Sequence, residues 1–329
     1  MDWAEKRVLV TGAGGFIGSH LTEHLADRGA DVRAFVRYNS RNDLGLLRLL
    51  PEERLDQVRI LMGDLRDADA LRTAVHDVDI VFHLGSLIAI PYSYIHPRET
   101  VETNLLGALN VFEAARDSGV EKIVHTSTSE VYGTARYVPI DEDHPLQGQS
   151  PYSASKIGAD KVAESFYRAF DVPIATIRPF NTYGPRQSAR AVIPTIIAQA
   201  LVQEEVALGA TYPTRDYTYV DDLVRAFVLI AESPRTVGEV INIGSNYEVS
   251  IGAIAEKVAS LIGKEIEIVV ESARLRPKKS EVERLWCDNT RARSLVGWSP
   301  SVPLEEGLVR TIAWFREHLD LYRSNHYVT

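Results

Sequence analysis

Two side chains that can exchange a proton stand four residues apart in the sequence, at Tyr152 and Lys156. In a helix this spacing places both side chains on one face, about one turn apart. A nearby ammonium group stabilises tyrosinate and lowers the pKa of the phenol, which makes Tyr152 usable as an acid–base group near neutral pH. Because the spacing alone is common by chance, the pair indicates proton transfer only together with the other motifs of the chain.

A glycine-rich segment near the amino terminus has the form of an anion-binding turn. It reads Thr11-Gly12-Ala13-Gly14-Gly15-Phe16-Ile17-Gly18 and lies between a predicted strand and a predicted helix. Gly12 and Gly15 allow the backbone to turn tightly and approach a pyrophosphate, while Gly18 allows close packing of helix and strand. The amino end of the helix, at Phe16 and Ile17, then faces the anion. This context predicts a dinucleotide site.

The residues that end the second predicted strand bear on which dinucleotide binds. A site that prefers NAD places an acid there to hold the adenosine ribose hydroxyls, whereas this chain has Val36, Arg37, Asn39 and Ser40. A guanidinium suits a 2′-phosphate, so the segment favours NADP over NAD; the alternative is that Arg37 is a solvated surface residue. The predicted cofactor-binding residues are Gly12, Gly15, Phe16, Ile17, Gly18, Arg37, Asn39, Ser40, Asp64, Leu65, Tyr152 and Lys156, with Asp64 and Leu65 expected at the adenine.

These motifs need a sheet that brings several strand ends together. Short β-branched runs alternate with helical patterns through the first half of the chain. Strands separated by helices need right-handed crossovers, which predict an α/β fold with a Rossmann-like, doubly wound parallel sheet. The predicted strands are Arg7–Thr11, Val32–Val36, Val58–Met62, Ile80–Leu84, Lys122–Ser127 and Ile174–Arg178, and the predicted helices are Ile17–Arg28, Ala68–Val75, Thr100–Ser118 and Ser153–Phe170.

After Arg178 the alternation loosens and prolines interrupt it. We expect residues 1–178 to form the dinucleotide-binding domain, with segments returning to it from about 216–245. Residues 179–329 are expected to form mainly a smaller α/β substrate domain, built from C-terminal insertions at the carboxyl ends of the strands, where ligands of such folds bind. The elements predicted here are the helices Pro194–Gln203, Asp221–Ala231, Ile251–Ile262 and Leu304–His318, the strands Val240–Ile243 and Glu265–Val270, and the loop Gly209–Arg215.

Composition limits the partners and the compartment. The net charge of −9 argues against nucleic acid as the main partner, because phosphate binding needs a basic face. The single cysteine, Cys287, cannot form an internal disulfide, which fits a reducing cytoplasm. No secretory signal opens the chain, and its apolar stretches are too short to span a bilayer. We therefore expect a cytoplasmic protein without a membrane or metal site.

The combined motifs resemble the extended short-chain dehydrogenase/reductase family, the NAD-dependent epimerases and dehydratases of nucleotide sugars. The resemblance covers essentially the whole chain and is carried by the glycine loop, His83-Leu84-Gly85-Ser86, Thr126-Ser127-Thr128-Ser129-Glu130-Val131-Tyr132-Gly133, Tyr152 with Lys156, Arg178-Pro179-Phe180-Asn181-Thr182-Tyr183-Gly184-Pro185-Arg186, and Arg215-Asp216-Tyr217-Thr218-Tyr219-Val220-Asp221-Asp222. It implies a UDP- or GDP-linked sugar whose diphosphate is held by Asn181, Arg186 and Arg215, with Arg276 as a further candidate. It also implies a homodimer formed through the helices 100–118 and 153–170.

Within the family, the segment Thr128-Ser129-Glu130 separates the subgroups. Simple 4-epimerases usually carry small residues here, whereas dTDP-glucose 4,6-dehydratases carry Thr-Asp-Glu. The resemblance therefore implies a 4,6-dehydratase with a tightly bound cofactor that is regenerated in each turnover. Tyr152, assisted by Thr128 and Lys156, would remove the C4 hydroxyl proton as hydride passes to the nicotinamide, and Glu130 would remove the C5 proton. The acid that protonates the departing 6-hydroxyl stays open between Glu130 and water held by Ser129.

Loop segments carry the closest resemblance, to the bacterial 4,6-dehydratases that begin legionaminic acid synthesis from a nucleotide-linked N-acetylglucosamine. These segments are 33–40, 87–94, 147–153 and 184–190. A C4 epimerase or a UDP-glucuronate decarboxylase remains an alternative, because both share the first oxidation. A redox-sensing binding module on the same fold is a further alternative, although such a protein need not retain Tyr152, Lys156 and Glu130.

Overall fold

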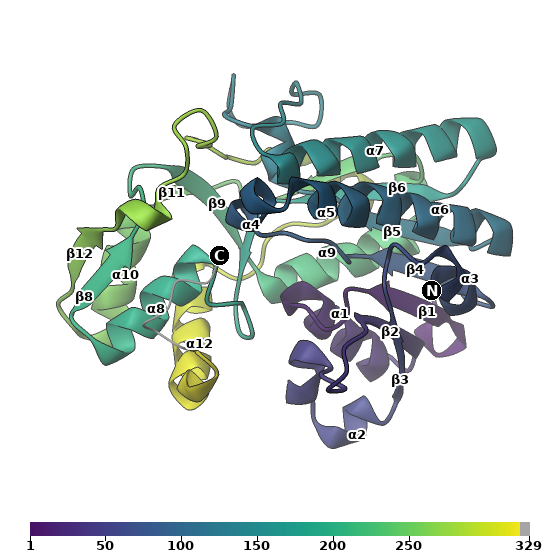
Figure 1. Ribbon diagram of the computed structural model, residues 1–329, viewed down its shortest axis with the longest axis horizontal. Coiled ribbons are helices and arrows are strands. Elements are labelled where there is room, and N and C mark those ends of the chain that lie inside the picture. Colours follow the sequence, from purple (N-terminus) through teal and green to yellow (C-terminus); the bar gives the residue numbers. More distant parts are fainter. Residues whose placement is uncertain (323–329) are drawn as a thin grey trace.

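The computed structural model describes residues 1–322, and its larger part is built on one seven-stranded sheet (Figure 1). The strand order is β10-β6-β5-β4-β1-β2-β3, and every neighbouring pair is parallel. Because the chain starts at β1 and winds outward in both directions, the predicted doubly wound, Rossmann-like α/β architecture is confirmed. The strands are β1 (Arg7–Thr11), β2 (Asp31–Arg37), β3 (Val58–Gly63), β4 (Ile80–His83), β5 (Lys122–Thr126), β6 (Ile174–Pro179) and β10 (Val240–Ile243).

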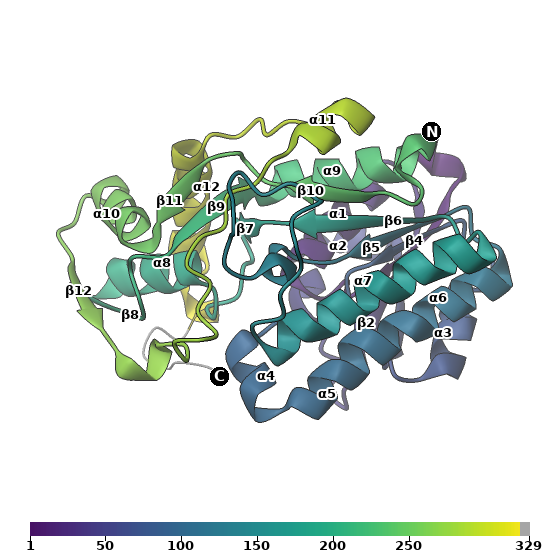
Figure 2. The same ribbon diagram turned by 90° about the horizontal axis from the view of Figure 1, so that it is seen from above.

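Helices cover both faces of this sheet, as Figure 2 shows from above. Alternate residues of β1 explain why: Val8 and Val10 pack into the apolar core on one face and Leu9 into the core on the other. A strand that is apolar on both sides must be covered on both sides. On one face lie α1 (Phe16–Asp27) and α9 (Val220–Glu232), and on the other lie α3 (Ala68–Val75), α6 (Gly107–Ser118) and α7 (Pro151–Phe170).

The smaller part lies beyond the carboxyl ends of the large sheet's strands (Figure 1). It contains a three-stranded sheet in the order β11-β9-β7 and the parallel pair β12–β8. Its elements are β7 (Asn181–Tyr183), α8 (Val192–Val202), β8 (Glu205–Leu208), β9 (Thr214–Tyr219), β11 (Glu248–Ser250), α10 (Ile251–Ile262), β12 (Glu267–Val270) and α12 (Leu304–Glu317). Four further helices are short: α2 (Glu52–Leu55), α4 (Ile90–Ile95), α5 (Pro97–Val101) and α11 (Thr290–Val296). Between residues 1 and 322, none of the helices combines the length and apolar character needed to cross a membrane.

The predicted single helix Thr100–Ser118 is interrupted in the structure. A π-helical turn at Glu102–Leu106 separates α5 from α6. Within that turn the Asn104 amide binds the backbone of Leu87, accepting from its nitrogen at 2.7 Å and donating to its oxygen at 2.9 Å. Asn104 also donates to Ser155 Oγ at 3.0 Å. The wider turn thus points one amide at both the loop after β4 and the helix α7, a pattern typical of functional sites.

Several further boundaries differ from the sequence prediction by one or two residues, and two of them have a clear cause. Helix α7 begins at Pro151, two residues before the predicted start, because Ser150 and Ser153 form a reciprocal capping box and proline suits the first helical position. The predicted loop Gly209–Arg215 ends early, since Thr214 and Arg215 already pair with β11.

Candidate active site

The glycine loop is packed so tightly that its glycines cannot be replaced without a shift. Gly12 has a φ of +71°, and a Cβ there would lie 2.7 Å from the Gly85 nitrogen after β4. A Cβ on Gly18 would collide with the Gly12 carbonyl. Gly15 is the N-cap of α1, so Phe16 and Ile17 form its first turn. This cradle at a helix amino end fits the pyrophosphate of a dinucleotide, as predicted.

A pocket beside the loop has the position expected for adenosine. It is formed by the carboxyl ends of β1 to β4 together with Thr103, and its lining residues are Gly12, Phe35, Arg37, Gly63, Asp64, Leu65, Gly85, Ser86, Leu87 and Thr103. Asp64 and Leu65 therefore line the pocket that was expected for the adenine. The Asp64 carboxylate accepts two hydrogen bonds from the Arg66 guanidinium, at 2.9 and 2.7 Å. That interaction holds the pKa of Asp64 below its usual value, so the carboxylate is ionised at neutral pH.

The three polar residues after β2 that were predicted to bind the cofactor have different surroundings in the structure. Arg37 lines the adenosine pocket, but its Nη2 lies 3.4 Å from Glu99 Oε1 of α5. The Asn39 side chain organises its own turn, donating to the Asp43 oxygen at 2.8 Å and accepting from the Asp43 nitrogen at 2.9 Å. Ser40 is exposed and, like Asn39, is not among the lining residues. The expectation that all three face the cofactor is thus corrected, because local turn bonds engage Asn39.

The catalytic pair lies at the start of α7, under the carboxyl end of β5. Tyr152 is in the first turn after the capping box, and Lys156 follows one turn later. Both are buried, at 7% and 3% exposure, and they share one face of α7, as predicted from their spacing. Lys156 Nζ donates to the Thr126 oxygen at 2.6 Å. Thr128 caps the short turn after β5, where its Oγ1 accepts from the Glu130 nitrogen at 3.2 Å.

Burial sets the charge state of this pair. It raises the pKa of Tyr152 above its usual value, and the hydrogen bond with Thr128 opposes that rise. Burial lowers the pKa of Lys156 to about 8, and the charge of Asp160 opposes that change. The expectation that Lys156 lowers the Tyr152 pKa is therefore not met, because desolvation raises that pKa and the charges of Glu130 and Asp160 raise it further. Any tyrosinate must be stabilised by further positive charge.

Sequence reasoning missed a buried polar network below the catalytic pair. Asp160 lies one turn beyond Lys156 on α7, and its Oδ2 accepts from Ser127 Oγ at 2.8 Å and from Arg178 at 3.1 and 3.0 Å. Arg178 also donates to the Tyr132 hydroxyl at 2.9 Å. The signal was present in the sequence, since residues 152, 156 and 160 repeat every four positions along one helix face.

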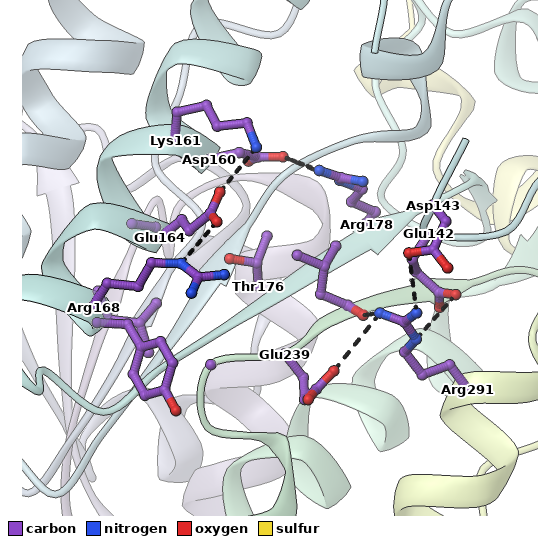
Figure 3. Close-up of a pocket in the computed structure, with 15 residues that line it drawn as sticks. Glu142, Asp143, Asp160, Lys161, Glu164, Arg168, Thr176, Arg178, Glu239 and Arg291 are labelled. Atoms are coloured by element: carbon purple, nitrogen blue, oxygen red, sulfur yellow. Dashed lines mark hydrogen bonds and ion pairs between the residues drawn. The ribbon is translucent and has the colours of Figure 1, made fainter. Parts of the chain in front are cut away.

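Asp160 and Arg178 of this network also line a polar pocket between α7 and β10 (Figure 3). The charges that line the pocket are mostly paired with one another. Glu164 binds both Lys161 and Arg168, while Arg291 lies 3.4 Å from Glu142 and 3.7 Å from Glu239. The pocket is thus lined by ion pairs and lies beside α7, the helix that carries Tyr152 and Lys156.

We expect Asp160→Asn to destabilise the fold by about 3–5 kcal/mol, because it leaves the buried Arg178 guanidinium without its carboxylate. The control Glu164→Gln, on the exposed side of the same helix, should cost at most about 1 kcal/mol. Chemical denaturation measures both free energies of unfolding. Equal effects for the two variants would contradict this role of Asp160.

The same residue predicts a pH dependence of stability. Burial alone would raise the Asp160 pKa, but His125 and Arg178 hold it at about 2, below the ordinary value of 3.8. Since the folded-state pKa is lowered, the stabilisation is present above about pH 4 and is lost as the pH falls toward 2. Denaturation curves recorded across this range should show that loss in the native protein and a smaller one in Asp160→Asn.

Four charged side chains form a second cluster, above the catalytic pair. Arg276 Nη1 lies 3.7 Å from Glu130 Oε1 and 3.9 Å from Glu281 Oε1, and Arg215 Nη2 lies 3.4 Å from Glu281. These contacts are long, and Arg276 Nη1 is buried without a hydrogen-bond partner among the described residues. Arg215 is also fixed by a hydrogen bond from its Nη1 to the Thr214 oxygen at 2.9 Å, so the two guanidinium groups of the cluster suit an incoming diphosphate. Glu281 was missed by sequence reasoning, although it follows the Arg276 segment.

The two remaining predicted substrate-binding residues, Asn181 and Arg186, lie in different surroundings. Asn181 pairs in register with Tyr217 in the strand pair β7–β9, two residues from Arg215. Arg186 has a φ of +65°, and its Nη2 lies 2.7 Å from Glu23 Oε2 of α1. Arg186 is thus held against α1 instead of joining the arginine cluster, which corrects its expected position.

Two further observations describe the site. Ser129 is buried, at 2% exposure, on the short turn that also carries Glu130. Over the part of the chain that the structure describes, no group of three or more histidine, cysteine or acidic residues is arranged to hold a metal ion.

Comparison with known proteins agrees with this geometry. The family model described as GDP-mannose 4,6 dehydratase matches residues 9–311. The chain is 35% identical over 316 residues to UDP-glucose 4-epimerase of Mycolicibacterium smegmatis, covering 94% of this chain and 98% of that protein. It is 30% identical over 327 residues to dTDP-D-glucose 4,6-dehydratase of Mus musculus, covering 97% and 91%. The crystal structure of DesIV, a dTDP-glucose 4,6-dehydratase from Streptomyces venezuelae with NAD and TYD bound, superposes with a TM-score of 0.85 at 29% identity, covering 96% of this chain and 98% of that one.

Proposed function

Because the chain belongs to the family of NAD-dependent nucleotide-sugar epimerases and dehydratases, we propose that it is a nucleotide-sugar 4,6-dehydratase. Its substrate would be an NDP-hexose, in particular NDP-N-acetylglucosamine, and its product the 4-keto-6-deoxy sugar. One observation carries the proposal: a buried turn capped by Thr128 after β5 carries a carboxylate, Glu130, whose negative charge also raises the pKa of Tyr152. A 4-epimerase, which removes a hydride from C4 and returns it there, needs no such base, whereas elimination of water across C5 and C6 does.

The chain's own residues supply the proton transfers. Tyr152 takes the proton of the C4 hydroxyl, with Thr128 hydrogen-bonded to the phenol and Lys156 one turn away. The nicotinamide cofactor, when bound, accepts the C4 hydride and later returns it to C6. The new C4 ketone acidifies the C5 proton, which Glu130 removes as the 6-hydroxyl leaves as water. The proton for that leaving group comes from Glu130 or from water held by Ser129, and when hydride reaches C6 the carbon at C5 takes up a proton from Glu130 that has exchanged with solvent. General acid–base assistance of this kind is worth about 10²–10⁴-fold.

The charges of the site suit a nucleoside diphosphate. We assign the diphosphate to Arg215 and Arg276, with Asn181 alongside, and do not include Arg186. In this assignment residues 1–178, with α9 and β10, bind the dinucleotide, and residues 179–329 bind mainly the UDP- or GDP-linked sugar. The likeness to enzymes that begin legionaminic acid synthesis stays a proposal and depends on loop residues alone.

The cofactor proposal is NADP or NAD in the glycine loop. Arg37 and the absence of an acid at the end of β2 support NADP, as predicted from the sequence. The solved relative described above holds NAD. The structure adds Glu99, a carboxylate next to Arg37 that opposes a 2′-phosphate.

Two properties implied by the resemblance stay predictions. A homodimer through α5, α6 and α7 is supported by the exposed apolar residues Val101, Leu106 and Phe170 on those helices. A cytoplasmic location is supported by the lone buried cysteine. Light scattering of the purified protein measures the first of these.

A C4 epimerase is the second candidate, favoured by the 35% identity to a UDP-glucose 4-epimerase. A UDP-glucuronate decarboxylase shares the same first step. A redox-sensing module is disfavoured, because it would have no use for Tyr152, Lys156 and Glu130 together.

Product mass distinguishes these functions. The purified protein is incubated with UDP- and GDP-linked glucose, N-acetylglucosamine, mannose and glucuronic acid, and the products are weighed. We expect loss of one water from a hexose substrate. Loss of carbon dioxide, or an isomer of unchanged mass as the sole product, would overturn the dehydratase proposal.

A further inference from the structure

Arg37 and Asp64 line the adenosine pocket, and each pairs with an oppositely charged residue at its rim, Glu99 and Arg66, in a different way. Arg66 and Asp64 form a closed fork with contacts of 2.9 and 2.7 Å. Arg37 has a single, longer contact of 3.4 Å to Glu99, and its side chain is 66% exposed. An exposed contact of this length is weak. Arg37 is therefore the arginine of this rim that can exchange its partner.

Glu99, in contrast, is anchored. The Tyr92 hydroxyl of α4 donates to Glu99 Oε2 at 2.6 Å, and the Tyr92 ring packs on His96 with a centroid distance of 4.5 Å. The hydrogen bond from Tyr92 lowers the pKa of Glu99, and the charges of Arg37 and Arg66 lower it further. A fixed, ionised carboxylate thus stands at the rim that Arg37 shares.

We infer that Glu99 selects against the 2′-phosphate of NADP. Dinucleotide sites commonly carry this function on an acid at the end of the second strand, which repels the phosphate. Here β2 ends in Val36, buried in the core, and Arg37. Glu99 supplies the missing negative charge from α5, a different element and 62 residues further along the chain.

The electrostatic argument distinguishes the two cofactors. To bind NADP, Arg37 must leave Glu99 for the phosphate, and the released carboxylate then stays close to a group of like charge. NAD lacks the 2′-phosphate, so its binding requires neither the release of Arg37 from Glu99 nor a phosphate close to the Glu99 carboxylate. This inference rests on the proposed dinucleotide site but not on which reaction the enzyme performs on the sugar.

Calorimetric titration of cofactor-stripped protein with NAD and NADP tests the inference. Glu99→Gln should tighten NADP binding about tenfold, while NAD affinity stays within about twofold. The gain should shrink in high salt, because charges at an exposed rim are screened. Adding Arg37→Ala to Glu99→Gln should abolish the gain, since the phosphate then lacks its cation.

Two controls separate charge from structure. Tyr92→Phe removes the hydrogen bond to Glu99 but keeps the carboxylate, and Glu102→Gln removes the neighbouring acid that pairs with Arg98. Tyr92→Phe should raise the relative affinity for NADP by less than Glu99→Gln does, because the carboxylate is kept, and Glu102→Gln should leave the ratio of the two affinities within about twofold of native. An unchanged ratio in Glu99→Gln, in protein that still binds NAD, would overturn the inference. Failure of the native protein to bind either cofactor would instead overturn the proposed dinucleotide site.

Discussion

Tyr152→Phe should lower turnover by about 10³-fold or more while leaving cofactor affinity within about twofold of native. The substitution removes one hydroxyl from a buried ring in the first turn of α7 and leaves the capping box of that helix intact. Loss of the group that takes the C4 proton removes general base catalysis from the first step, on which every later step depends. Steady-state product formation and calorimetric cofactor binding measure the two quantities.

The matched control is Tyr167→Phe, a second tyrosine of the same helix that lines the distant polar pocket. It should retain native activity, because its ring touches neither the glycine loop nor the charged cluster at Glu130. Near-native activity in Tyr152→Phe would remove the assigned role of this residue. Loss of both activity and cofactor binding would indicate a structural defect, which circular dichroism and thermal melting would reveal.

Glu130→Gln should separate the first reaction from the second. We expect C4 oxidation to continue and elimination to stop, so that reduced cofactor accumulates on the enzyme and product formation falls by about 10²–10⁴-fold. Absorbance of the reduced nicotinamide follows the first step and product mass follows the second. In deuterated water, the native enzyme should introduce one deuterium at C5, since Glu130 exchanges its proton with solvent before returning it.

Glu281→Gln provides the control for charge in this cluster. Glu281 contacts Arg276 at 3.9 Å, as Glu130 does at 3.7 Å, and it also contacts Arg215 at 3.4 Å. Its substitution should change KM without trapping reduced cofactor, because it does not act on Tyr152. Product from native enzyme without deuterium at C5, or full dehydratase activity in Glu130→Gln, would contradict the role given to Glu130.

The local motifs were predictable because each is set by neighbours in the chain. The strands of the large sheet were found from β-branched runs, and Tyr152 with Lys156 from helical spacing. Gly12 and Gly18 were identified because the strand–turn–helix pattern leaves few conformations for that loop, and both prove to have no room for a Cβ. Helix α7 brings Tyr152 and Lys156 to one face, as its periodicity requires.

Contacts between distant segments were not predictable in the same way. Nothing near Arg37 in the sequence indicates Glu99, since α5 reaches the end of β2 only through the crossover after β4. Arg186 lies in the same family motif as Asn181, yet its backbone has a positive φ and its side chain forms an ion pair with Glu23 of α1. The break of helix 100–118 depends on Asn104 finding Leu87 and Ser155.

The sequence by itself determined the sheet, the glycine loop and the catalytic helix, since hydrophobic periodicity and steric limits act over a few residues. Only the tertiary structure decided which charges meet: Arg276 with Glu130, Asp160 with Arg178, and Arg37 with Glu99. A Coulomb interaction depends on separation in space and on burial, and neither quantity is contained in the distance between two residues along the chain.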